Sequence, residues 1–75
     1  MKSMQTNEYK TFLKKLYQAR IESGLTQIEV AEKLKKPQSF ISKCEQGERT
    51  VNVIDLYRLS KIYNKNLDYF FSEIE

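Results

Sequence analysis

The chain has 75 residues and a formal net charge of +3, with 40% hydrophobic residues, four Phe, five Tyr, one Cys and no His. This length suits a single domain that buries only about 60% of its unfolded surface, so dimerisation would help to stabilise it. One Cys without any His excludes an internal disulfide and a Cys/His metal site, and two Gly with one Pro leave little room for linkers or hairpins, which favours an all-helical fold.

The first predicted helix follows a polar start. Residues 1–7 offer few apolar groups, so we expect a flexible N-terminus and a single domain over residues 8–75. From about Glu8 to Ser23 apolar residues recur at helical spacing, and Gly24 ends the run as a C-terminal cap. The start is not a signal peptide and no apolar run approaches the roughly 20 residues that span a bilayer, so we expect a cytoplasmic protein.

A capping box marks the start of a second helix, over about residues 26–35. The hydroxyl of Thr26 and the carboxylate of Glu29, three residues later, can each accept a hydrogen bond from the other residue's backbone N–H. The apolar residues that follow form one narrow stripe, so this helix is expected to pack on one side only.

Pro37 separates this helix from a third, over about residues 38–46. Its ring cannot donate a backbone hydrogen bond and disfavours helical geometry at the residue before it, while Gly47 supplies a natural stop. The connection of about three residues has the length found in a helix-turn-helix. Ile41 and Cys44 form a sparse buried edge. The other side chains are expected to be unclaimed by any core: Gln38, Ser39, Phe40, Ser42 and Lys43.

Two further helices complete the predicted fold. Asn52 and Asp55 repeat the capping-box spacing before an apolar stripe that continues to about Asn64, and Asn66 can cap a short fifth helix. The apolar side chains of that helix exceed what its own packing needs, which favours a two-fold dimer interface. We predict this interface at Tyr69, Phe71 and Ile74, with help from Tyr57 or Ile54. The alternative is that the aromatic side chains fold inward to close a small core.

A basic cluster lies beside the third helix. Lys33, Lys35, Lys36 and Lys43 fall within eleven residues that contain no acid. Charge runs are usually solvated surface, but next to a helix with an open polar face this cluster favours contact with phosphates, and we expect Lys36 to make one.

Together these features resemble the Cro and phage-repressor group of helix-turn-helix proteins, the Xre-like family. The resemblance covers about residues 12–71 and continues through the fourth helix into the fifth. It is carried by Arg20, Gly24-Leu25-Thr26-Gln27, Val30-Ala31, Ile41-Ser42, Glu45 and Gly47. It implies a compact five-helix, lambda-repressor-like DNA-binding domain, with a helix-turn-helix formed by helices two and three, that binds a two-fold-related operator as a dimer.

The resemblance also implies roles for single residues. The positions that reach base edges are Gln38, Ser39 and Lys43, with Ser42 and Phe40 helping. The positions that hold phosphates are Gln27, which also braces the first residue of the third helix, Arg49 and Asn52. Arg20 and Glu45 match a structural ion pair between helices one and three. Lys35 departs from the family, which commonly has Gly at this left-handed cap, at a cost on the order of 1 kcal/mol.

The function predicted from these observations is a sequence-specific, double-stranded DNA-binding transcription regulator, most simply a homodimeric repressor that controls its own promoter. Three roles stay open: a phage or mobile-element repressor, a restriction-modification controller and an antitoxin. The alternative from another class is a protein-interaction module, such as an antitoxin that binds a toxin, with DNA binding secondary. An enzyme is not expected, because the chain lacks His, a Gly-rich phosphate loop and a base partner for its Cys. We therefore predict no catalytic residues, cofactor, metal, small-molecule ligand or membrane partner.

Overall fold

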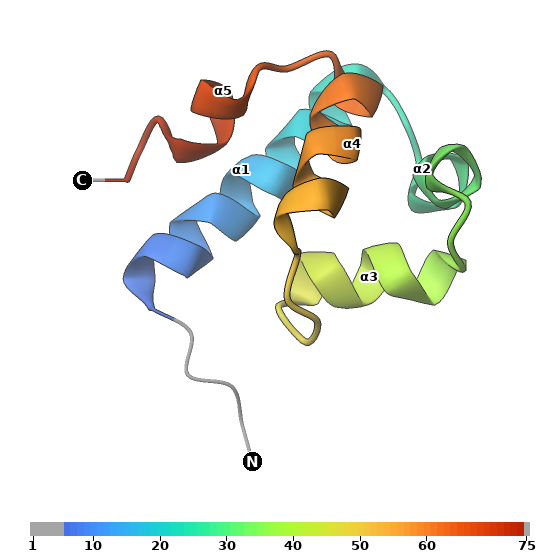
Figure 1. Cartoon of the computed structure of the whole chain (residues 1–75), viewed down its shortest axis with the longest axis horizontal. Coiled ribbons are helices and arrows are strands. Elements are labelled where there is room, and N and C mark those ends of the chain that lie inside the picture. The colour runs from blue at the N-terminus through green and yellow to red at the C-terminus, as the bar shows by residue number, and fades with distance from the viewer. Residues whose placement is uncertain (1–5, 75) are drawn as a thin grey trace.

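Five α-helices make up the part of the chain that the computed structural model describes, residues 6–74. They are α1 (Asn7–Ser23), α2 (Gln27–Leu34), α3 (Gln38–Gln46), α4 (Val53–Tyr63) and α5 (Leu67–Phe71). The predicted all-helical class is confirmed, with α2 and α3 forming a closely packed helix-turn-helix (Figure 1). None of these helices has the length and apolar character needed to cross a membrane.

The predicted flexible N-terminus lies mostly outside the described residues, which leave out residues 1–5. Its last two residues belong to the fold, because Thr6 caps α1 and Asn7 is the first residue of that helix. The helix therefore begins one residue earlier than the sequence pattern indicates.

Side-chain caps fix where four of the described helices begin. Thr26 and Glu29 form both hydrogen bonds of the predicted capping box at α2. The same N-cap position is held by a side chain that accepts a backbone N–H in three other helices: Thr6 for α1, Asn52 for α4 and Asn66 for α5. In contrast, α3 follows Pro37 without a side-chain cap. Its direction therefore depends on packing more than on its own N-terminus.

One apolar core joins all five helices. In Figure 1, α3 lies across the lower right of the view with α2 above its right-hand end, α4 and the diagonal α1 occupy the centre, and α5 lies at the upper left. The core is made of one stripe from each helix: Phe12, Leu13, Leu16 and Ala19 of α1, Val30, Ala31 and Leu34 of α2, Phe40, Ile41 and Cys44 of α3, Leu56, Leu59 and Tyr63 of α4, and Phe70 of α5. Burial also raises the pKa of the Cys44 thiol to about 11, so it packs as a neutral small side chain.

The turn between α2 and α3 contains a left-handed residue that carries a side chain. Lys35, the C-cap of α2, has φ 61° and ψ 45°. This backbone region brings Cβ close to the following carbonyl oxygen, at a cost of about 1–2 kcal/mol for most residues. The only other non-glycine residue described there is Asn64, whose residue type adopts this conformation more readily. The left-handed cap is thus kept although Gly is absent.

Lys35→Gly should raise the free energy of unfolding by about 0.5–1 kcal/mol, because relief of the left-handed strain exceeds the extra unfolded-state entropy of Gly. Thermal and urea unfolding of the variant without DNA would measure it. The matched control is Asn64→Gly, for which we expect a smaller gain. An equal or lower stability for Lys35→Gly would show that the cap is not strained.

Candidate nucleic-acid interface

The outer face of α3 is polar and open to solvent. Gln38, Ser39 and Lys43 are exposed and Ser42 is half-buried, on the side opposite the buried Ile41 and Cys44. Gln38 and Lys43 are about 7.5 Å apart along the helix axis, since each residue rises about 1.5 Å. Four of the five side chains predicted to reach base edges therefore share one accessible face.

Phe40 is the exception, and the expectation that no core claims it was wrong. Its side chain is only 6% exposed and belongs to the hydrophobic core. The reason is geometric: Phe40, Ile41 and Cys44 lie at helix positions i, i+1 and i+4, which share the inward side of α3. Phe40 is therefore not available to a base edge.

Two cations lie over the ring of Phe40. Nζ of Lys36 is 5.1 Å from the ring centroid, and the guanidinium carbon of Arg49 is 4.8 Å from it. Lys36 precedes α3 and Arg49 follows it, so one core side chain gathers positive charge from both of its flanking loops. Both cations were predicted to bind phosphates, and the ring restricts where their charges can lie.

Glu45 accepts three hydrogen bonds from two other helices. Nε and Nη2 of Arg20, in α1, donate to its two carboxylate oxygens at 2.6 and 3.1 Å, which forms the ion pair expected between these residues. Nε2 of Gln27, in α2, donates to the same carboxylate at 3.0 Å. Gln27 was expected to brace Gln38, so its partner on α3 is a different residue, one at the far end of the helix.

Arg20 connects further parts of the site. Its Nη1 donates to the backbone oxygen of Leu25 at 3.1 Å, so one guanidinium holds α1, the loop before α2 and α3 together. The hydrogen bond to Glu45 raises the pKa of Arg20 above its ordinary value, and the side chain is 11% exposed. A charged bidentate pair so far removed from solvent sets orientation as well as distance.

The loop that carries Arg49 is fixed by contacts at its end. Oδ1 of Asn52, predicted to hold a phosphate, accepts the backbone N–H of Asp55 at 2.8 Å and so caps α4. The hydroxyl of Tyr9 accepts the backbone N–H of Val51 at 3.1 Å, across 42 residues of sequence. Sequence reasoning missed this role of Tyr9, because no local pattern signals so distant a partner.

The residues predicted for a dimer interface face different ways. Tyr69 is half-buried, with Nζ of Lys15 and Nζ of Lys65 at 4.3 and 4.5 Å from its ring, and Phe70 is fully buried. Phe71 stacks on Phe12 at 5.9 Å yet stays 44% exposed. The inward alternative therefore holds for Phe70 and in part for Tyr69. Phe71, the half-buried Ile74 and the exposed Ile54 and Tyr57 of α4 remain open to a partner.

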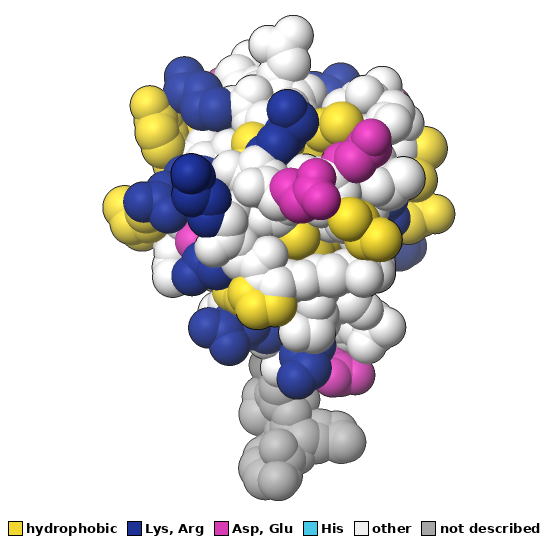
Figure 2. Space-filling view, turned by 90° about the vertical axis from the view of Figure 1, so that its right-hand side faces the viewer, with side chains coloured by type: hydrophobic (Ala, Val, Ile, Leu, Met, Phe, Trp, Pro, Cys, Tyr) yellow, Lys and Arg dark blue, Asp and Glu magenta, His cyan; other side chains and the backbone are white. Residues whose placement is uncertain are grey.

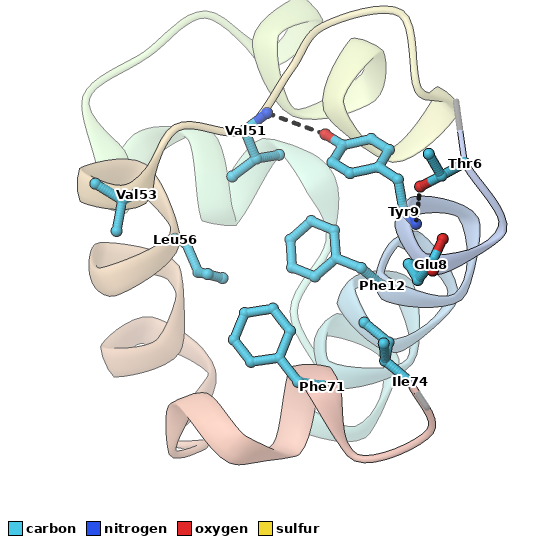
Figure 3. A pocket seen from close by; sticks show the side chains of 9 residues that line it. All are labelled: Thr6, Glu8, Tyr9, Phe12, Val51, Val53, Leu56, Phe71 and Ile74. Carbon is cyan, nitrogen blue, oxygen red and sulfur yellow. Dashed lines mark hydrogen bonds between the residues drawn. The ribbon is translucent and has the colours of Figure 1, made fainter. Parts of the chain in front are cut away.

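Phe71 and Ile74 border an apolar groove of about 360 Å³ between α1, the start of α4 and α5 (Figure 3). Phe12 and Leu56, from the core, also line the groove. Val53, on its rim, is 72% exposed. Such a groove presents apolar surface that solvent does not favour.

The predicted basic cluster divides into two surfaces. Lys43 lies on the exposed face of α3. Lys33, Lys35 and Lys36 instead line a cleft between the end of α2 and α4. The structure thus separates charges that are close in sequence.

Two comparisons with known proteins agree with each other. The family model described as Helix-turn-helix matches residues 16–70. The chain is also similar to the HTH-type transcriptional regulator ImmR of Bacillus subtilis (strain 168), with 37% identity over 62 residues, which are 83% of this chain and 49% of that protein. The chain therefore spans about half the length of this relative. No solved structure matches the chain significantly.

Glu45→Ala should lower the free energy of unfolding by about 3 kcal/mol, because it leaves the largely buried Arg20 charge without its acceptor. Urea unfolding monitored by circular dichroism would measure the change. Glu22→Ala is the matched control: it breaks the ion pair with Lys65, whose atoms are 2.7 Å apart, but solvent screens this pair and the loss should be much smaller. Equal losses in the two variants would contradict a structural role for the Arg20–Glu45 pair.

Proposed function

Because the chain belongs to the helix-turn-helix family, we propose that it is a transcription regulator that binds double-stranded DNA and reads base sequence in the major groove with α3. The observation that carries this proposal is the exposed polar face of α3, made of Gln38, Ser39, Ser42 and Lys43 and backed by buried residues. The major groove is wide enough to admit an α-helix, and each base pair presents a distinct pattern of donors and acceptors there.

The side chains on this face suit base recognition. The planar amide of Gln38 can form a bidentate pair with adenine, in which its oxygen accepts from N6 and its nitrogen donates to N7. Lys43 can donate to guanine O6 or N7, and each good pair discriminates against a wrong base by about 1–3 kcal/mol. The hydroxyl groups of Ser39 and Ser42 can both donate and accept, so they can contact donors or acceptors on a base edge. One helix therefore reads a short sequence.

Phosphate contacts would fix the helix in the groove without adding sequence information. Arg49 and Lys36, both against the Phe40 ring, supply two positive charges at the edges of the α3 face. Gln27 uses one N–H of its amide for Glu45 and can offer the other to a phosphate oxygen. The Asn52 amide can act in the same way beside the start of α4, since its oxygen already serves as the cap.

We further propose that the protein is a homodimer, since specific binding needs more bases than one helix can read. Two-fold dimers of this kind present two recognition helices about 34 Å apart, on one side of the duplex. The groove between α1, α4 and α5 supports this proposal, because a second copy could cover its apolar lining and the exposed Val53 and Phe71. Tyr69, which packs inward, is not part of the proposed interface.

A dimer bound across a promoter would exclude polymerase from the same DNA face, so repression, including repression of its own gene, is the regulatory effect that we propose. The similarity to a transcriptional regulator supports the general role.

Gln38→Ala and Lys43→Ala should relax base preference at single operator positions, while Arg49→Ala should weaken binding to all sequences and flatten the salt dependence by about one unit of slope. Selection from random DNA, followed by titrations at several salt concentrations, would measure both effects. Lys14→Ala, a change to an exposed lysine of α1, is the control and should leave both unchanged. Full operator selectivity in the Gln38 and Lys43 variants would refute recognition by α3.

Val53→Asp should weaken self-association at least tenfold, because it places a charge on the rim of the apolar groove. The fold should be kept, since an acidic side chain is favourable in the first turn of α4. Sedimentation equilibrium at micromolar concentration would measure association, with Ile21→Asp, at an exposed apolar position of α1, as the control. A monomeric parent protein, or equal weakening in the control, would refute this interface.

A further inference from the structure

A basic cleft of about 600 Å³ lies between the end of α2 and the outer side of α4, apart from the exposed face of α3. Figure 2 looks onto the side of the molecule that carries α2 and shows Lys and Arg side chains gathered toward the left of the view. The cleft is lined by five cations, namely Lys33, Lys35, Lys36, Arg58 and Lys61, together with Leu34, Tyr57 and Ile62.

The five cations lack internal compensation. Among residues 6–74, no Asp or Glu lines the cleft and none of the five cations forms an ion pair. Other basic residues of the chain do find a carboxylate: Arg20 pairs with Glu45 and Lys65 with Glu22. Like charges gathered around one concave surface repel each other and attract anions, and low-dielectric walls strengthen this field.

The cleft also offers apolar contacts. Leu34 is buried and Ile62 is half-buried, while Tyr57 is 52% exposed. Nζ of Lys61 lies 5.2 Å from the centroid of the Tyr57 ring, which places a charge next to an open aromatic side chain. A ligand that matches this surface combines several negative charges with one or two apolar groups.

We propose that this cleft is a docking site for an acidic segment of a partner protein, in which Asp or Glu side chains pair with the five cations and an apolar side chain packs on Tyr57. A polypeptide is narrow and flexible enough to follow a cleft between two helices. A duplex held along α3 is stiff and would have to bend to follow this cleft as well. The charge and the shape of the cleft thus favour a polypeptide.

Binding there would act on DNA binding through Lys36. This side chain lines the cleft, and its Nζ also lies over the ring of Phe40 beneath α3. An acidic partner would therefore neutralise a charge that the proposed function assigns to phosphate contact, and would add negative charge beside the DNA. This regulatory consequence rests on the proposed function, whereas docking itself does not.

The test uses the whole chain and a fluorescent peptide of about 14 residues that contains six Glu and two Leu. Fluorescence anisotropy at low salt should show binding that weakens at least tenfold in the double variant Arg58→Gln/Lys61→Gln. The matched control, Lys10→Gln/Lys14→Gln, removes two exposed lysines of α1 and should change the affinity less than twofold. The same peptide with every Glu replaced by Gln should not bind.

Amide chemical shifts identify the surface and separate the possible sources of binding. The acidic peptide should perturb residues 33–36 and 57–62 in the absence of DNA, so this result is independent of any operator. Perturbations confined to α3, equal binding by the double variant, or absence of binding would each overturn the proposal. It would also be overturned if the double variant lost affinity for a non-specific duplex as strongly as Arg49→Ala does, because the cleft would then serve nucleic acid.

Discussion

The arrangement of the proposed DNA-binding surface depends on the carboxylate of Glu45. It receives two hydrogen bonds from Arg20 and one from Gln27, so α3 is tied to both α1 and α2 by a single side chain. The helix has no side-chain cap at its own N-terminus, and the apolar contacts of Phe40, Ile41 and Cys44 have no strong direction. Charged, bidentate hydrogen bonds supply that direction. If they were lost, α3 could still be a helix, but its orientation relative to α1 and α2 would be less restricted.

Local chemistry was enough to predict most of the fold from the sequence. The Thr and Asn caps, Pro37 and the terminal Gly residues act over three or four positions, so the bounds of the first four helices follow within about one residue. The fifth helix was expected to carry Ile74, but α5 ends at Phe71. Phe40 was misread although a local signal was present. Residues 40, 41 and 44 repeat the spacing of the buried residues 30, 31 and 34 in α2, and an aromatic side chain at such a position belongs to the core.

The rest of the site could not be predicted, because it depends on contacts between distant segments. Tyr9 reaches the loop that carries Arg49 across 42 residues, and Gln27 meets α3 at Glu45 rather than at Gln38. The basic cleft is a further case: Arg58 and Lys61 join Lys33 and its neighbours only because α4 packs against α2. Helical periodicity tells which side of each helix is buried, but it does not tell which two exposed sides become neighbours.

The inward and outward side chains of α3 have separate roles, and this has a consequence for how the proposed DNA-binding surface could change. The side chains that anchor the helix are Phe40, Ile41, Cys44 and Glu45, and none of them lies on the open face that begins at Gln38. Exchange of the outward residues therefore leaves the anchoring contacts intact. If α3 reads bases as proposed, a few substitutions on its outer face would change the preferred operator without a compensating change in the interior.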